Sequence, residues 1–382
     1  MIPRHAQTAL LELAAGYPVL ALTGPRQSGK TTLAQAVFTH LPYVSLEDLD
    51  ELAFAQRDPR GFLARFPNGA VIDEAQRCPA VFSYLQGRVD AERRMGGFVL
   101  TGSQQFGLMA GITQSLAGRV GTVQLLPFGI YELVDARLPA GSLDSLLLRG
   151  LYPPLHDRAL DPARWYSNYV ASYLERDVRQ MSAVHNLSLF QRFVRMCAAR
   201  TAQLLNLSAL AIDCGISHST ARAWLSILEA SYIVFLLQPH YRNFGKRLVK
   251  TPKLYFHDPG LAASLLGIQD ESHMSVHPSR PALFETLIVN EFLKVRYHQG
   301  LRSNLYFWRD NVGNEIDLVL EHGAALVGVE IKSGQTLTSD YFLGVEKWAA
   351  IAGRESVGLH LVYGGESSFV REAVHVHSWR DV

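Results

Sequence analysis

The residues best suited to chemistry lie near the N-terminus, in the segment GPRQSGKT at positions 24–31. It fits the pattern G-x-x-x-x-G-K-[ST], follows the apolar run VLALT and precedes the helical sequence TLAQAVFTHL, which is the context that the pattern requires. The glycines let backbone amides turn toward phosphate oxygens, the lysine supplies positive charge, and the threonine offers a hydroxyl to Mg²⁺. We therefore expect an ATP-binding loop that comprises Gly24, Pro25, Arg26, Gln27, Ser28, Gly29, Lys30, Thr31 and Thr32.

An acidic pair follows an apolar run in the sequence AVIDEAQ, residues 70–76. The run is typical of a buried parallel strand, which would leave Asp73 and Glu74 at its carboxyl end. Asp73 is expected to hold Mg²⁺, directly or through water, and Glu74 to polarise the attacking water. An Asp-Glu pair is also a common charged strand end, and the phosphate-binding loop upstream is what favours the catalytic interpretation.

Two further residues could act on the nucleotide. Ser103 ends the strand-like segment GGFVLTGSQ and could sense the γ-phosphate or position the water, although a plain strand-end hydroxyl fits equally well. Arg119, in SLAGRV, is a candidate arginine finger, because phosphoryl transfer needs a cation at the developing charge. A surface arginine that caps a helix is the alternative for Arg119.

These motifs, with LLPFGIYEL after Arg119, resemble the AAA-type ATPases that carry a C-terminal domain of unknown function, DUF4143. The resemblance covers nearly the whole chain, through YLERDVRQ, the long segment TARAWLSILEASYIVFLLQPHYRNFGKRLVKTPKLYFHD, ALFE and GNEIDLVLE…GVEIKSG. It implies an α/β protein with a P-loop AAA-type ATPase domain, then a helical and winged-helix region, then an α/β domain similar to PD-(D/E)xK nucleases. It also suggests a homo-oligomeric ring, often of six subunits, in which Arg119 acts on a neighbour's nucleotide.

The segment LSALAIDCGISHSTARAWLSILEAS is typical of a helix-turn-helix unit, with Gly215 in the turn and Ser217 or Ser219 as N-cap of the second helix. Its apolar seam is expected to contain Ala209, Leu210, Ile212, Ile216, Trp224, Leu225 and Leu228. A basic stretch without acids, YRNFGKRLVKTPK, follows and could contact phosphates as a wing. The expected DNA-contacting residues are Ser219, Arg222, Arg242, Lys246, Arg247 and Lys250. Winged helices also serve as protein-contact modules, and that alternative stays open.

The segment GNEIDLVLEHGAALVGVEIKSG, residues 313–334, contains two apolar runs around a Gly-containing turn. In the nuclease pattern an Asp and a Glu on adjacent strands bind Mg²⁺, and a Lys two residues after the Glu positions the water. Asp317, Glu330 and Lys332 match these positions, and Glu285 on a preceding amphipathic helix matches the helical acid. The alternatives are an inactive nuclease fold kept as a platform and an ordinary charged hairpin with cross-strand pairs.

Elements that position these residues divide the chain into four expected domains. Short apolar runs at Val19–Leu22, Ala70–Ile72 and Phe98–Leu100 alternate with helical patterns, which indicates a parallel sheet. We place the ATPase domain at 1–137, a helical lid-like region at 138–200, the winged helix at 201–262 and the nuclease-like domain at 263–382.

Composition agrees with a folded protein of several domains. The chain has 382 residues, is 48% hydrophobic and has a formal net charge of +1, so a nucleic-acid partner would need local basic patches. The N-terminal sequence lacks the features of a secretion signal, no run of about 18 apolar residues occurs, and the three cysteines show no C-x-x-C spacing. We expect a cytoplasmic protein.

The function that these features favour is Mg²⁺-dependent ATP hydrolysis, coupled to remodelling or processing of DNA, including branched DNA. A first alternative is a metal-dependent DNA nuclease licensed by ATP. A second is an ATP-dependent switch that binds a protein partner and carries an inactive nuclease-like platform.

Overall fold

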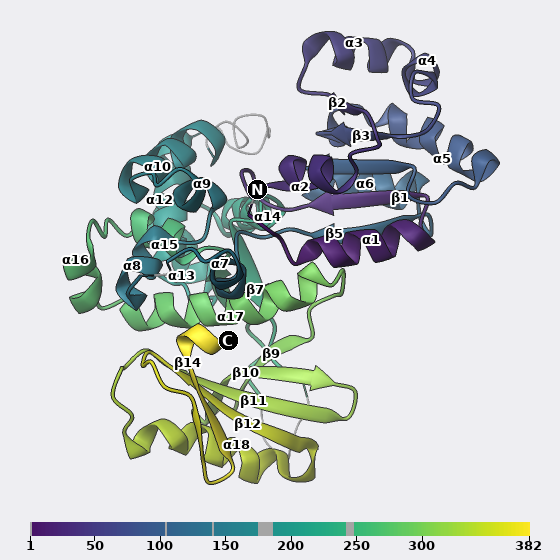
Figure 1. The fold of residues 1–382 in the computed structure, drawn as a ribbon. Coiled ribbons are helices and arrows are strands. Elements are labelled where there is room, and N and C mark those ends of the chain that lie inside the picture. The colour runs from purple at the N-terminus through teal and green to yellow at the C-terminus, as the bar shows by residue number, and fades with distance from the viewer. Residues whose placement is uncertain (1, 104, 140, 175–185, 242–247) are drawn as a thin grey trace. The chain divides into compact units, whose positions relative to one another are not determined.

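The computed structural model describes residues 2–103, 105–139, 141–174, 186–241 and 248–382 (Figure 1). The chain forms two compact units, each assembled from several segments. The first unit comprises Met1–Phe128, Ala230–Tyr232 and Lys294–Arg302, and the second comprises Gly129–Glu229, Ile233–Leu293 and Ser303–Val382.

The first unit alternates helices and strands along the chain. Its elements are α1 (Ala6–Gly16), β1 (Val19–Thr23), α2 (Lys30–Val37), β2 (Tyr43–Ser45), α3 (Leu49–Arg57), α4 (Pro59–Ala64), β3 (Ala70–Asp73), η1 (Ala75–Arg77), α5 (Ala80–Glu92), β4 (Phe98–Gly102), α6 (Gln105–Ser115) and β5 (Val120–Gln124). The strands form one parallel sheet in the order β2-β3-β4-β1-β5.

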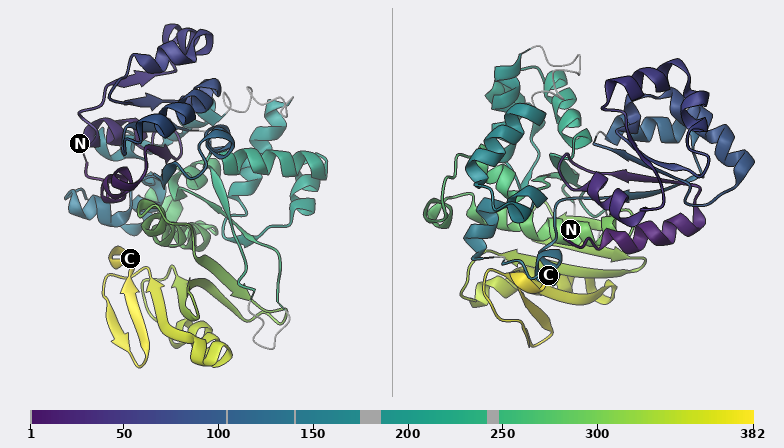
Figure 2. Two further views of the ribbon diagram at one scale, coloured as in Figure 1. Left: turned by 90° about the vertical axis from the view of Figure 1, so that its right-hand side faces the viewer. Right: turned by 45° about the horizontal axis from the view of Figure 1, so that its top comes forward.

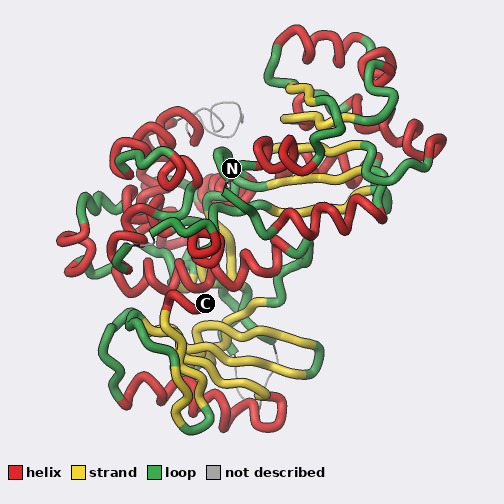
Figure 3. Tube along the Cα trace, in the orientation of Figure 1, coloured by secondary structure: helices red, strands yellow, loops and turns green. Residues whose placement is uncertain are grey.

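Both faces of this sheet are covered by helices (Figure 3). Leu20 and Leu22 of β1 pack in one core with α1 and α2, whereas Val19 and Ala21 pack in a second core with α3, α4, α5 and α6. Because successive side chains of a strand point to opposite faces, an entirely apolar strand such as β1 requires this two-sided burial. The order of the strands also places β4 between β1 and β3, so the ends of the three strands are neighbours.

The second unit begins with helices and a small antiparallel sheet. The helices and the sheet elements are α7 (Ile130–Asp135), α8 (Leu143–Arg149), α9 (Pro153–Asp157), α10 (Pro162–Tyr169), η2 (Val170–Leu174), α12 (Leu187–Ala198), β6 (Gln203–Leu204), α13 (Leu207–Cys214), α14 (His218–Ala230), β7 (Val234–Leu237), β8 (Lys253–Phe256), α15 (Pro259–Leu265) and α16 (Glu271–Val276). The small sheet has the order β6-β8-β7, with β8 in the middle. A helix pair followed by such a sheet is the expected arrangement of a winged helix.

A six-stranded mixed sheet completes the second unit (Figures 1 and 2). Its elements are α17 (Arg280–His298), whose last residues belong to the first unit, β9 (Leu305–Arg309), β10 (Glu315–His322), β11 (Ala325–Lys332), η3 (Ser339–Phe342), α18 (Leu343–Ala352), η4 (Gly353–Glu355), β12 (Ser356–Tyr363), β13 (Phe369–Arg371), β14 (Val374–Ser378) and η5 (Trp379–Asp381). The order is β13-β14-β12-β11-β10-β9, and Val345 and Trp348 of α18 pack on one face.

The architecture confirms the α/β fold class expected from the sequence. The three strands expected at Val19, Ala70 and Phe98 are β1, β3 and β4, and the hairpin expected at 313–334 is β10 and β11. Within the part of the chain that the structure describes, no helix combines the length and the apolar composition needed to cross a membrane. Each of the three cysteines, Cys78, Cys197 and Cys214, is buried as a free thiol.

Candidate nucleotide site and a nuclease-like carboxylate cluster

The expected phosphate-binding loop connects β1 to α2. Gly24 and Gly29 have φ values of +145° and +92°, in a region that favours glycine. A Cβ atom on Gly24 would lie 2.1 Å from the carbonyl oxygen of Leu125, which follows β5. The first glycine of the pattern is therefore required by a close backbone approach as well as by its φ angle.

Lys30 is buried at the first position of α2. Its Nζ donates hydrogen bonds to the carbonyl oxygens of Gly24 (3.0 Å) and Pro25 (2.7 Å), which hold the ammonium group inside the loop. Burial lowers the pKa of Lys30 to about 8, against the opposing attraction of Glu74 and Asp73. The Ser28 hydroxyl is buried in the same loop and contacts no hydrogen-bond partner among the described residues.

The remaining loop residues differ in their surroundings. Arg26 contacts Glu47, with 3.6 Å between Nη1 and Oε1, and Gln27 adopts a positive φ of 60°. Thr31 is half-buried on α2 and Thr32 is exposed. The sequence pattern did not point to Arg4, whose buried guanidinium donates to the carbonyl oxygens of Ser28 and Leu126 at 2.7 Å each. Arg4 thus ties the phosphate loop to the segment after β5.

Asp73 is the meeting point of several hydroxyl groups. Thr31 Oγ1 lies 3.1 Å from both carboxylate oxygens of Asp73, which joins the phosphate loop to the end of β3. Tyr43 at the start of β2 donates to Oδ2 at 2.9 Å, and Thr101 of β4 donates to Oδ1. Burial and the negative charge of Asp73 raise the pKa of Tyr43 to about 12. Tyr43 was missed from the sequence because a three-residue strand leaves too short a pattern to recognise.

Glu74 follows β3 in a left-handed conformation, with φ of 52°. Its Oε2 accepts hydrogen bonds from Gln76 Nε2 and from Ser103 Oγ, the latter at 3.2 Å. Ser103 can reach Glu74 because β4 lies between β1 and β3. The structure therefore brings together Lys30, Thr31, Asp73, Glu74 and Ser103 at the carboxyl end of the sheet.

Arg119 lies elsewhere in the same unit. It immediately precedes β5, whose Val120 pairs with Val19, so it is at the amino end of the sheet, about 15 Å of strand away from the phosphate loop. Its Nε and Nη2 contact the carboxylate of Asp90 on α5 at 2.5 and 2.9 Å. Arg119 does not line the nucleotide site of its own chain, and its action on a neighbouring subunit stays a prediction.

The expected nuclease-like residues also come together, in the second unit. The hairpin register that pairs Leu318 with Val329 places Asp317 next to Glu330. Lys332 Nζ contacts Glu330 Oε1 and lies 3.9 Å from Asp317 Oδ2. Glu285 of α17 accepts hydrogen bonds from Tyr255 and from Lys253 of β8, the latter at 2.9 Å.

Burial of these carboxylates changes their acidity. Burial raises the pKa of Glu285 to about 7, with the charge of Lys253 opposing and that of Asp317 assisting the change. Burial and the neighbouring Asp317 raise the pKa of Glu330 to about 8, against the attraction of Lys332. The two carboxyl groups therefore hold protons more readily than exposed glutamates do.

As arranged, the nuclease-like residues do not fit a divalent cation. The ammonium group of Lys253 contacts Glu285 and Glu315 and lies 3.8 Å from Asp317, so positive charge already fills the centre of the cluster. Within the described part of the chain, no group of three or more His, Cys, Asp or Glu side chains is arranged to hold a metal ion. The metal centre expected at Glu285, Asp317 and Glu330 stays a prediction, and the structure adds to its residues Lys253, a lysine from another sheet.

Comparisons with known proteins agree with this arrangement. An AAA domain matches residues 16–134, a domain of unknown function (DUF8612) matches 140–272, and a domain of unknown function (DUF4143) matches 280–381. An uncharacterized protein of Mycobacterium tuberculosis is 32% identical over 371 residues, which is 96% of this chain and 81% of the relative. An uncharacterized protein of Mycobacterium bovis matches with the same identity and coverage. The chain belongs to the AAA-type P-loop ATPases with a C-terminal DUF4143 domain.

Solved structures of other ATPases are more distant from this DUF4143-containing ATPase. A Walker-type ATPase of Pyrococcus abyssi is 16% identical and covers 69% of this chain and 96% of its own, with a TM-score of 0.46. RuvB of Thermotoga maritima is 18% identical and covers 61% of this chain and 88% of its own, with a TM-score of 0.33. The family membership rests on the domain matches and on the mycobacterial relatives.

The winged-helix region of this ATPase exposes part of the expected DNA-contacting set. Ser217 caps α14 by accepting a hydrogen bond from the Thr220 amide at 3.1 Å, and Ser219 and Arg222 are exposed in the first turns of α14. Lys250 is exposed before β8, whereas Arg242, Lys246 and Arg247 lie outside the described residues. The apolar seam needs one correction, because Ile212 of α13 is 78% exposed.

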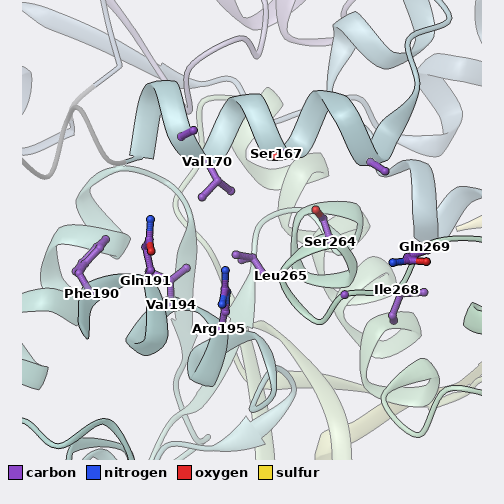
Figure 4. A pocket seen from close by; sticks show the side chains of 13 residues that line it. Ser167, Val170, Phe190, Gln191, Val194, Arg195, Ser264, Leu265, Ile268 and Gln269 are labelled. Atoms are coloured by element: carbon purple, nitrogen blue, oxygen red, sulfur yellow. The ribbon is translucent and has the colours of Figure 1, made fainter. Parts of the chain in front are cut away.

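A cleft of about 440 Å³ lies among α10, η2, α12 and α15 of the ATPase (Figure 4). In Figure 4, Val170 comes from one side of the cleft, Phe190 and Arg195 from α12, and Leu265 from α15. The lining mixes apolar groups with the polar ends of glutamine, arginine and serine. No residue that the sequence singled out for chemistry lines this cleft.

Proposed function

We propose that this AAA-type ATPase hydrolyses ATP with Mg²⁺ and couples the hydrolysis to remodelling of DNA bound by its winged helix. The observation that carries the hydrolysis is the contact of Thr31 and Asp73, which joins the phosphate loop to the strand end that bears Glu74. Hydroxyl and carboxylate oxygens at one point are the donors that Mg²⁺ prefers, so Thr31 and Asp73 fit this ion. When bound, Mg²⁺ offsets negative charge on the β and γ phosphates.

Lys30, Glu74 and Ser28 have separate roles in binding phosphate and activating water. Lys30 is held by two loop carbonyls and can exchange these acceptors for phosphate oxygens without leaving the loop. Glu74 is the base that takes a proton from the attacking water, and its carboxylate is oriented by Gln76 and Ser103. The buried Ser28 hydroxyl, which has no partner among the described residues, is an additional group for phosphate.

The hydrolysis is tested by replacing Lys30. Lys30→Ala should lower the rate of phosphate release from Mg·ATP by about a hundredfold or more, because a charge at the transferred phosphoryl group is lost. Lys347→Ala, an exposed lysine on α18, is the matched control and should keep the wild-type rate. Equal rates for the wild type and Lys30→Ala would overturn the assignment.

DNA binding is supported by the exposed Ser219 and Arg222 on α14 and by the exposed Lys250 before β8. Fluorescence anisotropy with linear, forked and four-way branched DNA should show affinity that falls steeply with salt. Removing Arg222 or Lys250 should weaken binding on all sequences and reduce the salt slope by about one for each lost phosphate contact. An absence of DNA affinity even at low salt would contradict the proposal and favour the protein-binding switch.

Coupling is measured by the ATPase rate in the presence of the same DNA panel. We expect at least one DNA structure to raise the ATPase rate of the wild type, and we expect this increase to be absent in Lys30→Ala. If no DNA changed the ATPase rate, the assignment of ATP hydrolysis would be kept and the proposed coupling to DNA remodelling would be contradicted.

A further inference from the structure

Lys253 occupies an unusual place for a lysine. It is the first residue of β8, the middle strand of the winged-helix sheet, and pairs with Leu204 on one side and Leu237 on the other. Its side chain is only 5% exposed. A buried ammonium group is costly unless anions surround it, so the burial of Lys253 requires carboxylates in contact with its Nζ atom.

Those partners are the nuclease-like carboxylates. The Nζ atom of Lys253 lies 2.7 Å from Glu315 Oε1, 2.9 Å from Glu285 Oε1 and 3.8 Å from Asp317 Oδ1. The three oxygens come from α17 and β10, and the ammonium group comes from β8. The face of the Phe307 ring, whose centroid is 5.5 Å from Nζ, covers the group from the side of β9. The surroundings of this nitrogen are those of a bound cation.

We propose that Lys253 is the resident cation of the nuclease-like site, where its ammonium group takes the place of the divalent metal. Mg²⁺ needs oxygen ligands at about 2.1 Å. The Glu285 and Glu315 oxygens already contact the Lys253 ammonium nitrogen, so this nitrogen occupies the position that the ion would take. Two further cations complete the neutralisation, since Arg309 contacts Glu315 at 3.0 Å and Lys332 contacts Glu330. Four carboxylates thus face three built-in positive groups.

This arrangement changes what the cluster does. Lys253 joins the middle strand of the winged-helix sheet to α17 and to β10 of the six-stranded sheet through one buried ionic centre. The carboxylates that would hold a catalytic metal in a nuclease instead hold two sheets together. The C-terminal domain is then a platform for the winged helix and has no metal-dependent cleavage of its own.

Binding of Mn²⁺ in the absence of nucleotide tests the proposal, independently of ATP hydrolysis. Lys253→Met keeps the length of the side chain and removes its charge, so it should bind one Mn²⁺ per chain more than the wild type in electron paramagnetic resonance titrations. Adding Asp317→Asn to Lys253→Met should abolish the extra site. Lys347→Met is the matched control and should behave as the wild type.

Two outcomes of this titration would overturn the proposal. One is a Mn²⁺ site in the wild type that Asp317→Asn removes, since the lysine would then yield to metal. The other is a Lys253→Met protein that is folded by circular dichroism and gains no site, since the carboxylates would then not form a metal-competent set.

A second test uses the wild-type protein and therefore does not require Lys253→Met to fold. Amine acetylation followed by mass spectrometry should leave Lys253 unmodified both in EDTA and in millimolar Mn²⁺, while exposed Lys347 reacts in both. Reaction of Lys253 that begins when Mn²⁺ is added, or that is already rapid in EDTA, would show that the ammonium group is displaced or was never enclosed, and the proposal would fail.

Discussion

Glu74 shows how much of the nucleotide site depends on single side chains. Glu74→Gln keeps the hydrogen-bonding shape of the side chain and removes its basicity, so we expect turnover to fall by about a hundredfold or more while ATP affinity stays near that of the wild type. Ser103→Ala should cause a smaller loss, because Gln76 still holds Glu74. Phosphate release and fluorescent-nucleotide binding give the two quantities.

The control for the glutamate is Glu92→Gln. Glu92 is an exposed residue of α5 that pairs with Arg88 at 2.8 Å, and its replacement should change neither quantity. If Glu74→Gln hydrolysed ATP at the wild-type rate, the base would have to be another group.

A pH effect on stability is expected from three histidines on neighbouring strands. Partial burial, with the neighbours His377 and His375, lowers the pKa of His360 on β12 to about 4. His360 Nδ1 lies 2.8 Å from His377 Nε2, and the rings of His360 and His375 are stacked. Since an unfolded chain protonates its histidines near pH 6.5, the unfolded state binds more protons between these two pH values, and the free energy of unfolding falls as pH decreases through this window.

Urea unfolding at pH 7.5 and at pH 5 measures this dependence. Because other groups titrate as well, the difference between the wild type and His360→Gln is the informative quantity. The wild type should lose about 1 kcal/mol more than the variant between the two pH values, a figure already reduced for solvent screening of a half-buried group. Equal losses would mean that His360 titrates as it does in the unfolded chain.

Residues were predictable from the sequence where a fixed local spacing ties them to a motif. Lys30 and Thr31 are adjacent in a strand-loop-helix pattern. Asp73 ends, and Glu74 follows, a strand that is recognisable from its apolar run. Arg4, Tyr43 and Lys253 were not predictable, because their partners are brought to them only by the tertiary fold. A buried lysine is indistinguishable from a surface lysine in a sequence, so Lys253 was assigned to the basic wing, whereas its side chain is buried against Glu285 and Glu315.

At the scale of elements, the turn between α13 and α14 should depend on its glycine. Gly215 has φ of +70° with open space around its Cβ position, so the cost of Gly215→Ala is one of backbone conformation only. We expect the free energy of unfolding to fall by about 1 kcal/mol. Gly87→Ala is the opposite case, because Gly87 lies inside α5 with open space and no left-handed φ, and it should stabilise by about 0.5–1 kcal/mol.

Urea unfolding midpoints of Gly215→Ala and Gly87→Ala, compared with that of the wild type, measure the two stability changes. Shifts of the same sign would contradict the conformational argument. Comparable destabilisation in Gly215→Asn and Gly215→Ala would contradict it too, because asparagine tolerates the left-handed region better.

Strands were predictable in proportion to their apolar character. β1, β3 and β4 are buried on both faces and stand out as apolar runs. β5 alternates half-buried and buried residues in the sequence VGTVQ, and β2 has three residues, so neither produced a recognisable run. Ile212 shows the converse error, since an apolar residue at helical spacing was assigned to the seam and is exposed.

For the whole molecule, the sequence offers little on how segments regroup. The four expected domains were drawn as consecutive stretches, whereas the first compact unit collects Ala230–Tyr232 and Lys294–Arg302 in addition to the N-terminal segment. Tyr232 donates to the Thr23 hydroxyl at 2.8 Å, and Lys294 Nζ donates to the Phe128 carbonyl at 2.7 Å. The two later segments join the first unit through contacts between residues far apart in sequence, and no local pattern predicts such contacts.

Assembly into a ring is the prediction that belongs to this scale. Arg119 lies at the amino end of the first unit's sheet, away from its own phosphate loop, so it can act on a nucleotide only from a neighbouring subunit. Light scattering should therefore show a larger species when a non-hydrolysable ATP analogue is added. Arg119→Ala should bind ATP as the wild type does and lose most of its hydrolysis, since an arginine finger is worth about a thousandfold in turnover.

Mixing two inactive proteins separates an arginine that acts on a neighbour from one with a structural role. In a ring that contains both Arg119→Ala and Lys30→Ala subunits, an intact phosphate loop can stand beside an intact arginine, so the mixture should hydrolyse ATP faster than either protein alone. Asp90→Ala breaks the ion pair with Arg119 and keeps the arginine, so it should retain turnover. If Asp90→Ala lost hydrolysis as Arg119→Ala does and the mixture stayed inactive, the arginine would serve only to hold α5 against the sheet.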